Sequence, residues 1–124
     1  MLAKIYLIAI SASFLLFGAW SIVDPIGMTA RMGVEVSGLS GAFEMRGVYG
    51  GVSLGAGLLC LAGAMRTAVE KPALFFLVAY MGGYVIGRTA SLVAGDSASV
   101  YSWGFAGFEA VAGLIAALLL FRKA

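Results

Sequence analysis

Four long apolar stretches follow one another along the chain, separated by short segments that contain glycine, proline or charged residues. They cover about residues 5–23, 43–65, 72–94 and 101–121. Each is close to the roughly 20 residues that an α-helix needs to cross the hydrocarbon core of a bilayer. The pattern therefore predicts an all-α fold, an integral membrane bundle of four transmembrane helices formed by residues 1–124 as one domain.

The connections predict turns and one further short helix. Asp24-Pro25 ends the first span and favours a new helix, because proline suits a first helical position. Residues 26–32 are expected to form a short interfacial helix in the first outer loop, with Met28 and Met32 able to face the lipid. Three further turns are predicted from composition, at residues 34–41, 66–71 and 95–97.

The composition requires a lipid environment. Hydrophobic residues make up 62% of the chain and charged residues 11%, whereas soluble domains are about half apolar and a quarter charged. A soluble fold of this size does not bury so much apolar surface. The net charge of +2 is small and scattered, which argues against nucleic-acid binding.

The sequence carries little recognisable chemistry. It contains no histidine, and its single cysteine, Cys60, lies in an apolar run where an inert packing role is expected. No catalytic triad, metal-ligand spacing or phosphate-binding loop is present. These absences favour a non-enzymatic protein, and the sequence implies no cofactor or metal.

Basic residues indicate the orientation. Those on one side of the four-span arrangement are Lys4, Arg66, Lys71, Arg122 and Lys123. The opposite loops contain one basic residue, Arg31, together with Asp24, Glu35 and Asp96. The positive-inside rule therefore predicts that the N- and C-termini lie in the cytoplasm.

Four ionisable residues fall within the apolar spans: Glu44, Arg46, Arg88 and Glu109. A charge at the bilayer centre costs about 3 kcal/mol, so such residues usually face inward and pair. At about 1.5 Å per residue, Arg88 and Glu109 both lie about 10 Å inside the outer boundary. Because their helices form an antiparallel hairpin, we predict that they form an ion pair. Glu44 is expected in the first turn of its helix, where it complements the dipole, and Arg46 is near enough to the boundary to extend outward.

Polar side chains at helical spacing accompany these charges and predict a pocket in the outer half of the bundle. The residues proposed for this buried charge cluster or ligand site are Glu44, Arg46, Tyr49, Tyr80, Tyr84, Arg88 and Glu109. Two interpretations of the Arg88–Glu109 pair stay open. One is a structural link between helices, and the other is a working ligand site.

Glycines at four-residue spacing predict close helix packing, in the manner of a glycine zipper. The helix-packing residues are Gly47, Gly51, Gly55, Gly83, Gly87 and Gly113. Packing within the chain is the simpler interpretation of these glycines. The alternative is a face for another subunit.

Several motifs resemble a known family. The second span opens with Glu-Met-Arg-Gly-Val-Tyr-Gly-Gly at 44–51, the third closes with Gly87-Arg88 and Ser91-Leu92, and the fourth contains Glu109. Together they resemble the bacterial domain-of-unknown-function 4345 family, small four-helix membrane proteins similar in layout to the DoxX-like group. The resemblance covers nearly the whole chain. It implies the four-span fold, a place in the bacterial inner membrane and the importance of the four charged residues, but no established activity. DoxX-like proteins are linked to redox partners, whereas this chain has no cysteine pair.

Three functional hypotheses follow. The first is a packing or accessory subunit of a homo-oligomer or larger membrane complex, whose partners are the bilayer, itself or other membrane subunits. The second is a membrane-embedded binder of a lipophilic molecule, such as a quinone, an isoprenoid or a lipid, in the outer-leaflet pocket. The third is an oligomeric transporter of small solutes in which Glu109 carries a proton or cation.

Overall fold

The computed structural model describes residues 1–122, and these residues form helices with no strand. One segment, η1, is a π-helix, and the others are α-helices. In chain order the elements are α1 (Leu2–Val23), α2 (Pro25–Arg31), α3 (Gly38–Met45), η1 (Arg46–Gly51), α4 (Val52–Met65), α5 (Thr67–Val93) and α6 (Val100–Phe121).

The four long apolar helices predicted from the sequence are present. Four helical segments are long and apolar enough to cross a membrane: Leu2–Val23, Gly38–Met65, Thr67–Val93 and Val100–Phe121. The second of these joins α3, η1 and α4 into one continuous helix. The protein is therefore an all-helical integral membrane bundle, as the apolar pattern predicts.

Two helices begin earlier than expected. The second span starts at Gly38 rather than near residue 43, so Glu44 lies in the last turn of α3 and the prediction of a first-turn position is wrong. α5 starts at Thr67, and Pro72 is its sixth residue instead of its first. At this position proline removes the hydrogen bond to the carbonyl of Ala68 and its ring crowds that carbonyl, so it is inside the helix and not at its favoured first position. The proline therefore does not mark where α5 begins.

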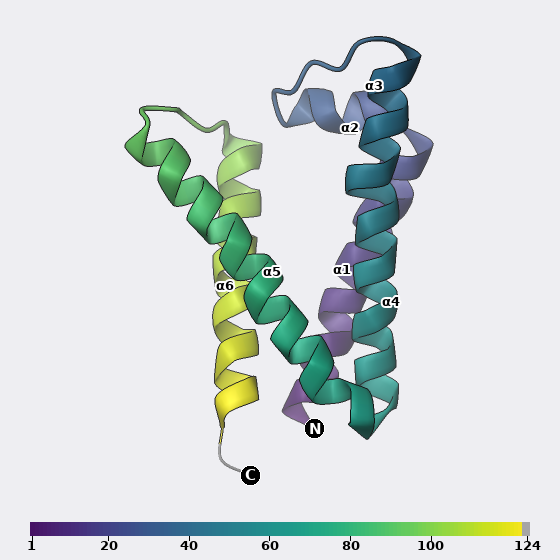
Figure 1. Ribbon diagram of the computed structural model, residues 1–124, viewed down its shortest axis with the longest axis vertical. Helices are drawn as coiled ribbons and strands as arrows, with labels where there is room; N and C mark the ends of the chain where they lie inside the picture. The colour runs from purple at the N-terminus through teal and green to yellow at the C-terminus, as the bar shows by residue number, and fades with distance from the viewer. Residues whose placement is uncertain (123–124) are drawn as a thin grey trace.

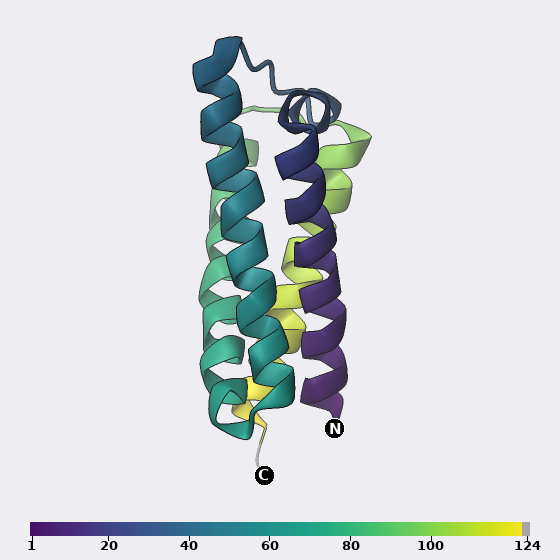
Figure 2. The same ribbon diagram turned by 90° about the vertical axis from the view of Figure 1, so that its right-hand side faces the viewer.

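The helices are arranged as two antiparallel pairs, α1 with α4 and α5 with α6 (Figure 1). α4 and α5 meet at the end of the bundle that holds the N-terminus and the end of α6, which we call the terminal end. Toward the opposite end, which holds α2 and which we call the α2 end, the two pairs diverge (Figure 1). α2 and the segment after it lie across that end (Figures 1 and 2).

The core is formed by small and branched side chains where the four helices are close. Leu7, Cys60 and Leu77 are fully buried there, and the burial of Cys60 fits the expected packing role. The hydroxyl of Ser11 donates a hydrogen bond of 2.8 Å to the backbone oxygen of Gly57, which joins α1 to α4. The hydroxyl of Tyr6 donates to the backbone oxygen of Ala112 on α6.

Most of the glycines predicted to pack do not face a neighbouring helix. A Cβ atom added at Gly113 would lie 3.0 Å from the Cβ of Met81, so this glycine does allow α6 to approach α5. At the other five glycines an added Cβ atom would meet no atom of a neighbouring helix within 4 Å. These are Gly47, Gly51, Gly55, Gly83 and Gly87. Within the chain, close approach depends instead on other glycines, such as Gly57 against Leu15 and Gly63 against Ala73.

The short helix predicted in the first outer loop is present as α2. Asp24 caps it, accepting a hydrogen bond of 3.0 Å from the backbone N–H of Gly27, and Pro25 is its first residue. Met28 and Thr29 are fully buried, so the expectation that Met28 faces lipid is wrong. The physical reason is that α2 lies over the bundle and buries one side against it.

Candidate functional site: a pocket around the Arg88–Glu109 pair

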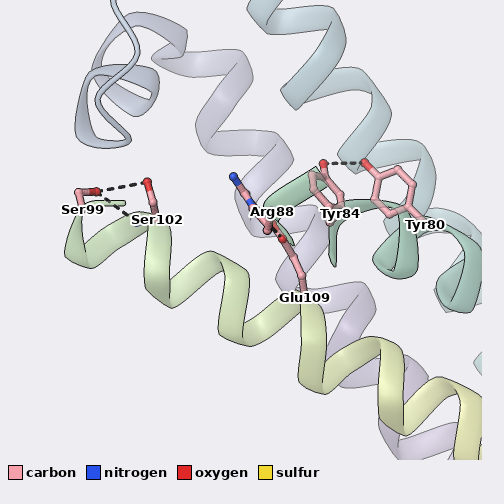
Figure 3. Close-up of polar contacts among 6 residues, drawn as sticks. All are labelled: Tyr80, Tyr84, Arg88, Ser99, Ser102 and Glu109. Atoms are coloured by element: carbon pink, nitrogen blue, oxygen red, sulfur yellow. Dashed lines mark hydrogen bonds and ion pairs between the residues drawn. The ribbon is translucent and has the colours of Figure 1, made fainter. Parts of the chain in front are cut away.

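Arg88 on α5 and Glu109 on α6 form the predicted ion pair (Figure 3). The contact is bidentate. Nη2 of Arg88 lies 2.8 Å from Oε1 of Glu109, and Nε lies 3.1 Å from Oε2. Such paired hydrogen bonds combine charge attraction with a fixed planar geometry. The antiparallel run of α5 and α6 brings the two residues to the same depth, which is the relationship expected from the sequence.

The two partners of the pair are unequally buried. The side chain of Glu109 is only 7% exposed, whereas that of Arg88 is 43% exposed. The carboxylate therefore depends on the guanidinium for its hydrogen bonds. The guanidinium in turn has a second edge that faces open space.

Tyrosines extend the polar side of α5 from Arg88 toward the terminal end. The guanidinium carbon of Arg88 lies 5.8 Å from the centre of the Tyr84 ring, a cation–π distance. The hydroxyls of Tyr84 and Tyr80 are 3.2 Å apart and share a hydrogen bond (Figure 3). This chain of contacts orders one face of α5 at the depth of the ion pair.

A pocket of about 620 Å³ lies between the two helix pairs, and Arg88 and Glu109 form part of its wall. All four spans contribute to it, and Met32 and Val34 contribute from the segment after α2. Its remaining lining residues are Ser13, Phe14, Phe17, Tyr49, Ser53, Met81, Tyr84, Val100, Tyr101, Ser102, Gly104, Phe105 and Phe108. The pocket thus combines an apolar, largely aromatic wall with one charged, hydrogen-bonding corner.

Phe17 organises the aromatic wall. Its ring makes edge-to-face contacts with Tyr49 at 6.2 Å and with Phe105 at 5.6 Å between ring centres. These contacts join α1 to η1 and to α6 across the pocket. Edge-to-face pairs of this kind are favourable beyond their buried area, so they hold the wall in place while leaving the pocket open.

Tyr49 lies at the pocket on the π-helix η1. The sequence predicts Tyr49 as a site residue but does not predict a π-helix there. Here the backbone N–H of Val52 donates to the carbonyl of Gly47, five residues earlier instead of four. Single π-helical turns occur mostly inside α-helices and often at functional sites. The only sequence signal is the pair Gly50-Gly51, of which Gly50 packs closely against Ile22 of α1.

Arg46 and Glu44 do not belong to the pocket. Both are exposed at the α2 end. Nε of Arg46 donates a hydrogen bond of 2.9 Å to the backbone oxygen of Ile22, in the last turn of α1. Arg46 therefore satisfies a carbonyl that the end of α1 leaves without a helical partner.

Tyr80 lies outside the main pocket as well. It lines a second, more open concavity of about 430 Å³ on α5, together with Gly83, Gly87 and Ser91. Tyr84 and Arg88 line both this concavity and the main pocket. Of the seven site residues predicted from the sequence, the pocket brings together Tyr49, Tyr84, Arg88 and Glu109.

None of the site residues predicted from the sequence lies on α1, although α1 forms one side of the pocket. Ser13, Phe14 and Phe17 line it, and their spacing of three and four residues places them on one helix face. In an almost wholly apolar helix, however, that spacing does not distinguish the pocket side from the lipid side. Among residues 1–122, no three His, Cys, Asp or Glu side chains come together as a metal site requires.

Comparisons with known proteins give one match. The model of a family described as a domain of unknown function, DUF4345, matches residues 2–120. Comparison with curated proteins and with solved structures finds no match. Because the family model covers nearly all of the sequence, the chain belongs to the DUF4345 family.

Proposed function

We propose that the protein binds a lipophilic small molecule inside the membrane, in the pocket around Arg88 and Glu109. The observation that carries this proposal is the combination of volume and lining. A volume of about 620 Å³ falls within the roughly 300–1,000 Å³ typical of ligand sites, which are mostly apolar with a few convergent polar groups. An apolar wall at membrane depth selects for a molecule that already partitions into lipid.

The unequal burial of the ion pair supports this proposal over a purely structural link. A polar group at membrane depth is costly unless it is hydrogen-bonded. Glu109 is satisfied by Arg88, but Arg88, which is 43% exposed and lines both the pocket and the concavity beside it, has a remaining edge with no partner among the described residues. Water or a ligand must satisfy that edge, and an aromatic pocket favours a ligand over a cluster of waters.

The orientation we propose places the pocket in the outer leaflet of a bacterial inner membrane. Lys4, Arg66, Lys71 and Arg122 lie toward the terminal end of the bundle, whereas the pocket lies toward the α2 end. Lys123, the fifth basic residue of the prediction, lies outside the described residues. By the positive-inside rule the terminal end is cytoplasmic, so a lipophile reaches the pocket from the outer leaflet.

Native mass spectrometry of the protein, extracted gently from its own membrane, tests this proposal. We expect one small molecule per chain. Gly104→Leu supplies a blocked variant, because Gly104 lines the pocket and an added Cβ meets no atom within 4 Å. Gly107→Leu is the matched control, since Gly107 lies on the same helix in equally open space and does not line the pocket.

The expected result is loss of the bound mass in Gly104→Leu and its retention in Gly107→Leu. If the wild-type chain carries no small molecule, or if both variants retain it equally, the proposal is wrong. Both substitutions replace a glycine in α6 with a good helix former, so folding itself should not separate them.

A second proposal, self-association as a packing subunit, is favoured by the glycines of the second span. Gly47, Gly51 and Gly55 contact no neighbouring helix of the chain. In lipid, helices associate through small residues that allow backbones to approach, and these glycines offer such a face to a second copy. We expect a dimer in mild detergent that Gly55→Leu abolishes and Gly107→Leu preserves. A strictly monomeric wild-type protein would exclude this second proposal.

A further inference from the structure

We infer that the ligand has an uncharged head group with carbonyl oxygens that accept hydrogen bonds, carried on an apolar tail. This inference rests on the proposed binding function and specifies its ligand class. Two kinds of membrane molecule share this chemistry, a glycerolipid whose only polar groups are esters and a hydroxyl, and a quinone ring. Three properties of the pocket lead to this class.

The first property is charge balance. Of the residues that line the pocket, Arg88 and Glu109 alone carry a charge, and they neutralise each other through two hydrogen bonds. An anionic head group would add a third charge beside the buried carboxylate of Glu109. At membrane depth such an unbalanced charge is expensive, so a neutral head group fits better.

The second property is a surplus of hydrogen-bond donors. A guanidinium has five N–H groups and no acceptor, and Glu109 takes two of them. Within residues 1–122 no hydrogen bond occupies the other three, and Figure 3 shows a guanidinium nitrogen of Arg88 directed away from Glu109. Each carboxylate oxygen of Glu109 already accepts one of these bonds, and because the side chain is only 7% exposed, little of its remaining acceptor capacity reaches the pocket. The charged corner therefore donates hydrogen bonds, and the ligand must accept them.

The hydroxyls around the pocket do not reverse this balance. Ser13 donates to the backbone oxygen of Ala9. Tyr84 is paired with Tyr80, and the hydroxyl of Ser102 accepts from that of Ser99 (Figure 3). Ser53, Tyr49 and Tyr101 also line the pocket, and each adds a hydroxyl that can donate one hydrogen bond as well as accept. Carbonyl oxygens are the uncharged groups that best match such donors, because each has two lone pairs.

The third property is the apolar remainder of the pocket. Phe14, Phe17, Phe105 and Phe108 line it together with Met81. Aromatic rings provide large apolar contact area and accept either an acyl or isoprenoid chain or the face of a flat ring. The wall therefore accommodates both molecules that share the carbonyl head-group chemistry.

The test is a titration of delipidated, reconstituted protein by native mass spectrometry with four probes. They are a diacylglycerol, a short-tailed benzoquinone, a phosphatidic acid with the same acyl chains as the diacylglycerol, and a hydrocarbon of similar length. We expect at least one carbonyl probe to bind about tenfold more tightly than the hydrocarbon, which accepts no hydrogen bond. We expect it also to bind about tenfold more tightly than the phosphatidic acid, because the pocket has no further charge to balance the phosphate. The carbonyl probe that binds more tightly shows whether the natural ligand is a glycerolipid or a quinone.

A double variant separates head-group recognition from tail binding. Arg88→Met combined with Glu109→Met removes both charges and leaves no buried amide that could donate to a probe, and replacement of a buried ion pair by apolar residues of similar volume is generally tolerated. We expect it to bind the carbonyl probe and the hydrocarbon within about threefold of each other. Unchanged selectivity in this variant would overturn the inference.

The titration distinguishes a wrong head-group inference from a wrong binding function. If phosphatidic acid binds most tightly and Gly104→Leu still blocks it, the pocket binds ligands but the head-group inference is wrong. If no probe binds, or if Gly104→Leu changes no affinity, the binding function and the inference are both wrong.

Discussion

Glu109 is buried and Arg88 is half-exposed, although the two residues share two hydrogen bonds. This asymmetry means that the two residues are not interchangeable. Among residues 1–122 the carboxylate has no other partner to replace the guanidinium, whereas the guanidinium has access to the pocket. The consequences for stability and for binding therefore differ between the two sides of the pair.

Substitutions at the pair should destabilise the protein unequally. Arg88→Met leaves a buried carboxylate without its partner, and we expect it to lower the free energy of unfolding by about 3 kcal/mol. Glu109→Gln keeps one acceptor and should cost about 1 kcal/mol. Unfolding by a denaturing detergent in mixed micelles measures both, with Arg122→Met as the control at the exposed end of α6. A larger loss for Glu109→Gln than for Arg88→Met would contradict this account.

Two glycines of the second span should respond oppositely to alanine. A Cβ at Gly63 would lie 2.8 Å from the Cβ of Ala73, so Gly63→Ala must push α4 and α5 apart and should cost about 1–3 kcal/mol. A Cβ at Gly55 meets no atom within 4 Å, and Gly55→Ala should be neutral or stabilise a monomer by up to about 1 kcal/mol. The same unfolding measurement compares the two variants. If both change the free energy of unfolding equally, the packing of α4 against α5 is not as described here.

The hydrogen bond between α1 and α4 should contribute modestly to stability. Ser11→Ala removes the bond from the Ser11 hydroxyl to the Gly57 carbonyl and should cost about 0.6 kcal/mol, the average for such bonds in membranes. Ser13→Ala is the control, because the Ser13 hydroxyl bonds only within its own helix. If the two variants unfold with the same free energy, the bond between the helices contributes nothing measurable.

The contact between Arg46 and α1 should protect the end of that helix. Arg46→Met removes the donor to the Ile22 carbonyl, so hydrogen exchange in the last turn of α1 should accelerate by about fivefold, corresponding to about 1 kcal/mol. Arg31→Met, also at the α2 end, should leave that exchange unchanged. Acceleration in both variants would point to a general effect of charge and not to this hydrogen bond.

Cysteine labelling in intact cells tests the proposed orientation. With Cys60→Ala as the background, Ser99→Cys at the α2 end should react with a membrane-impermeant maleimide, because Ser99 is exposed between α5 and α6. Thr67→Cys, exposed at the terminal end, should react only after the membrane is opened. The reverse result would place the termini outside the cytoplasm.

Parts of the site could be predicted from the sequence because they depend only on how deep each residue lies in the membrane. Arg88 and Glu109 lie at matching distances from one turn, and the antiparallel hairpin of α5 and α6 brings any such pair together. The positions of Glu44 and of Met28 depended on where α3 begins and how α2 folds back, and both expectations were wrong.

The number of spans, their approximate places and the ion pair could be predicted from the amino-acid sequence, because hydrophobic length and helical rise are local properties. The packing of the helices against one another was needed to show which glycines face inward, where the π-helix widens the second span and which side chains line the pocket. The reason is that nearly every face of these helices is apolar. Periodicity therefore does not distinguish the side that faces lipid from the side that faces another helix, and only the contacts between helices make that choice.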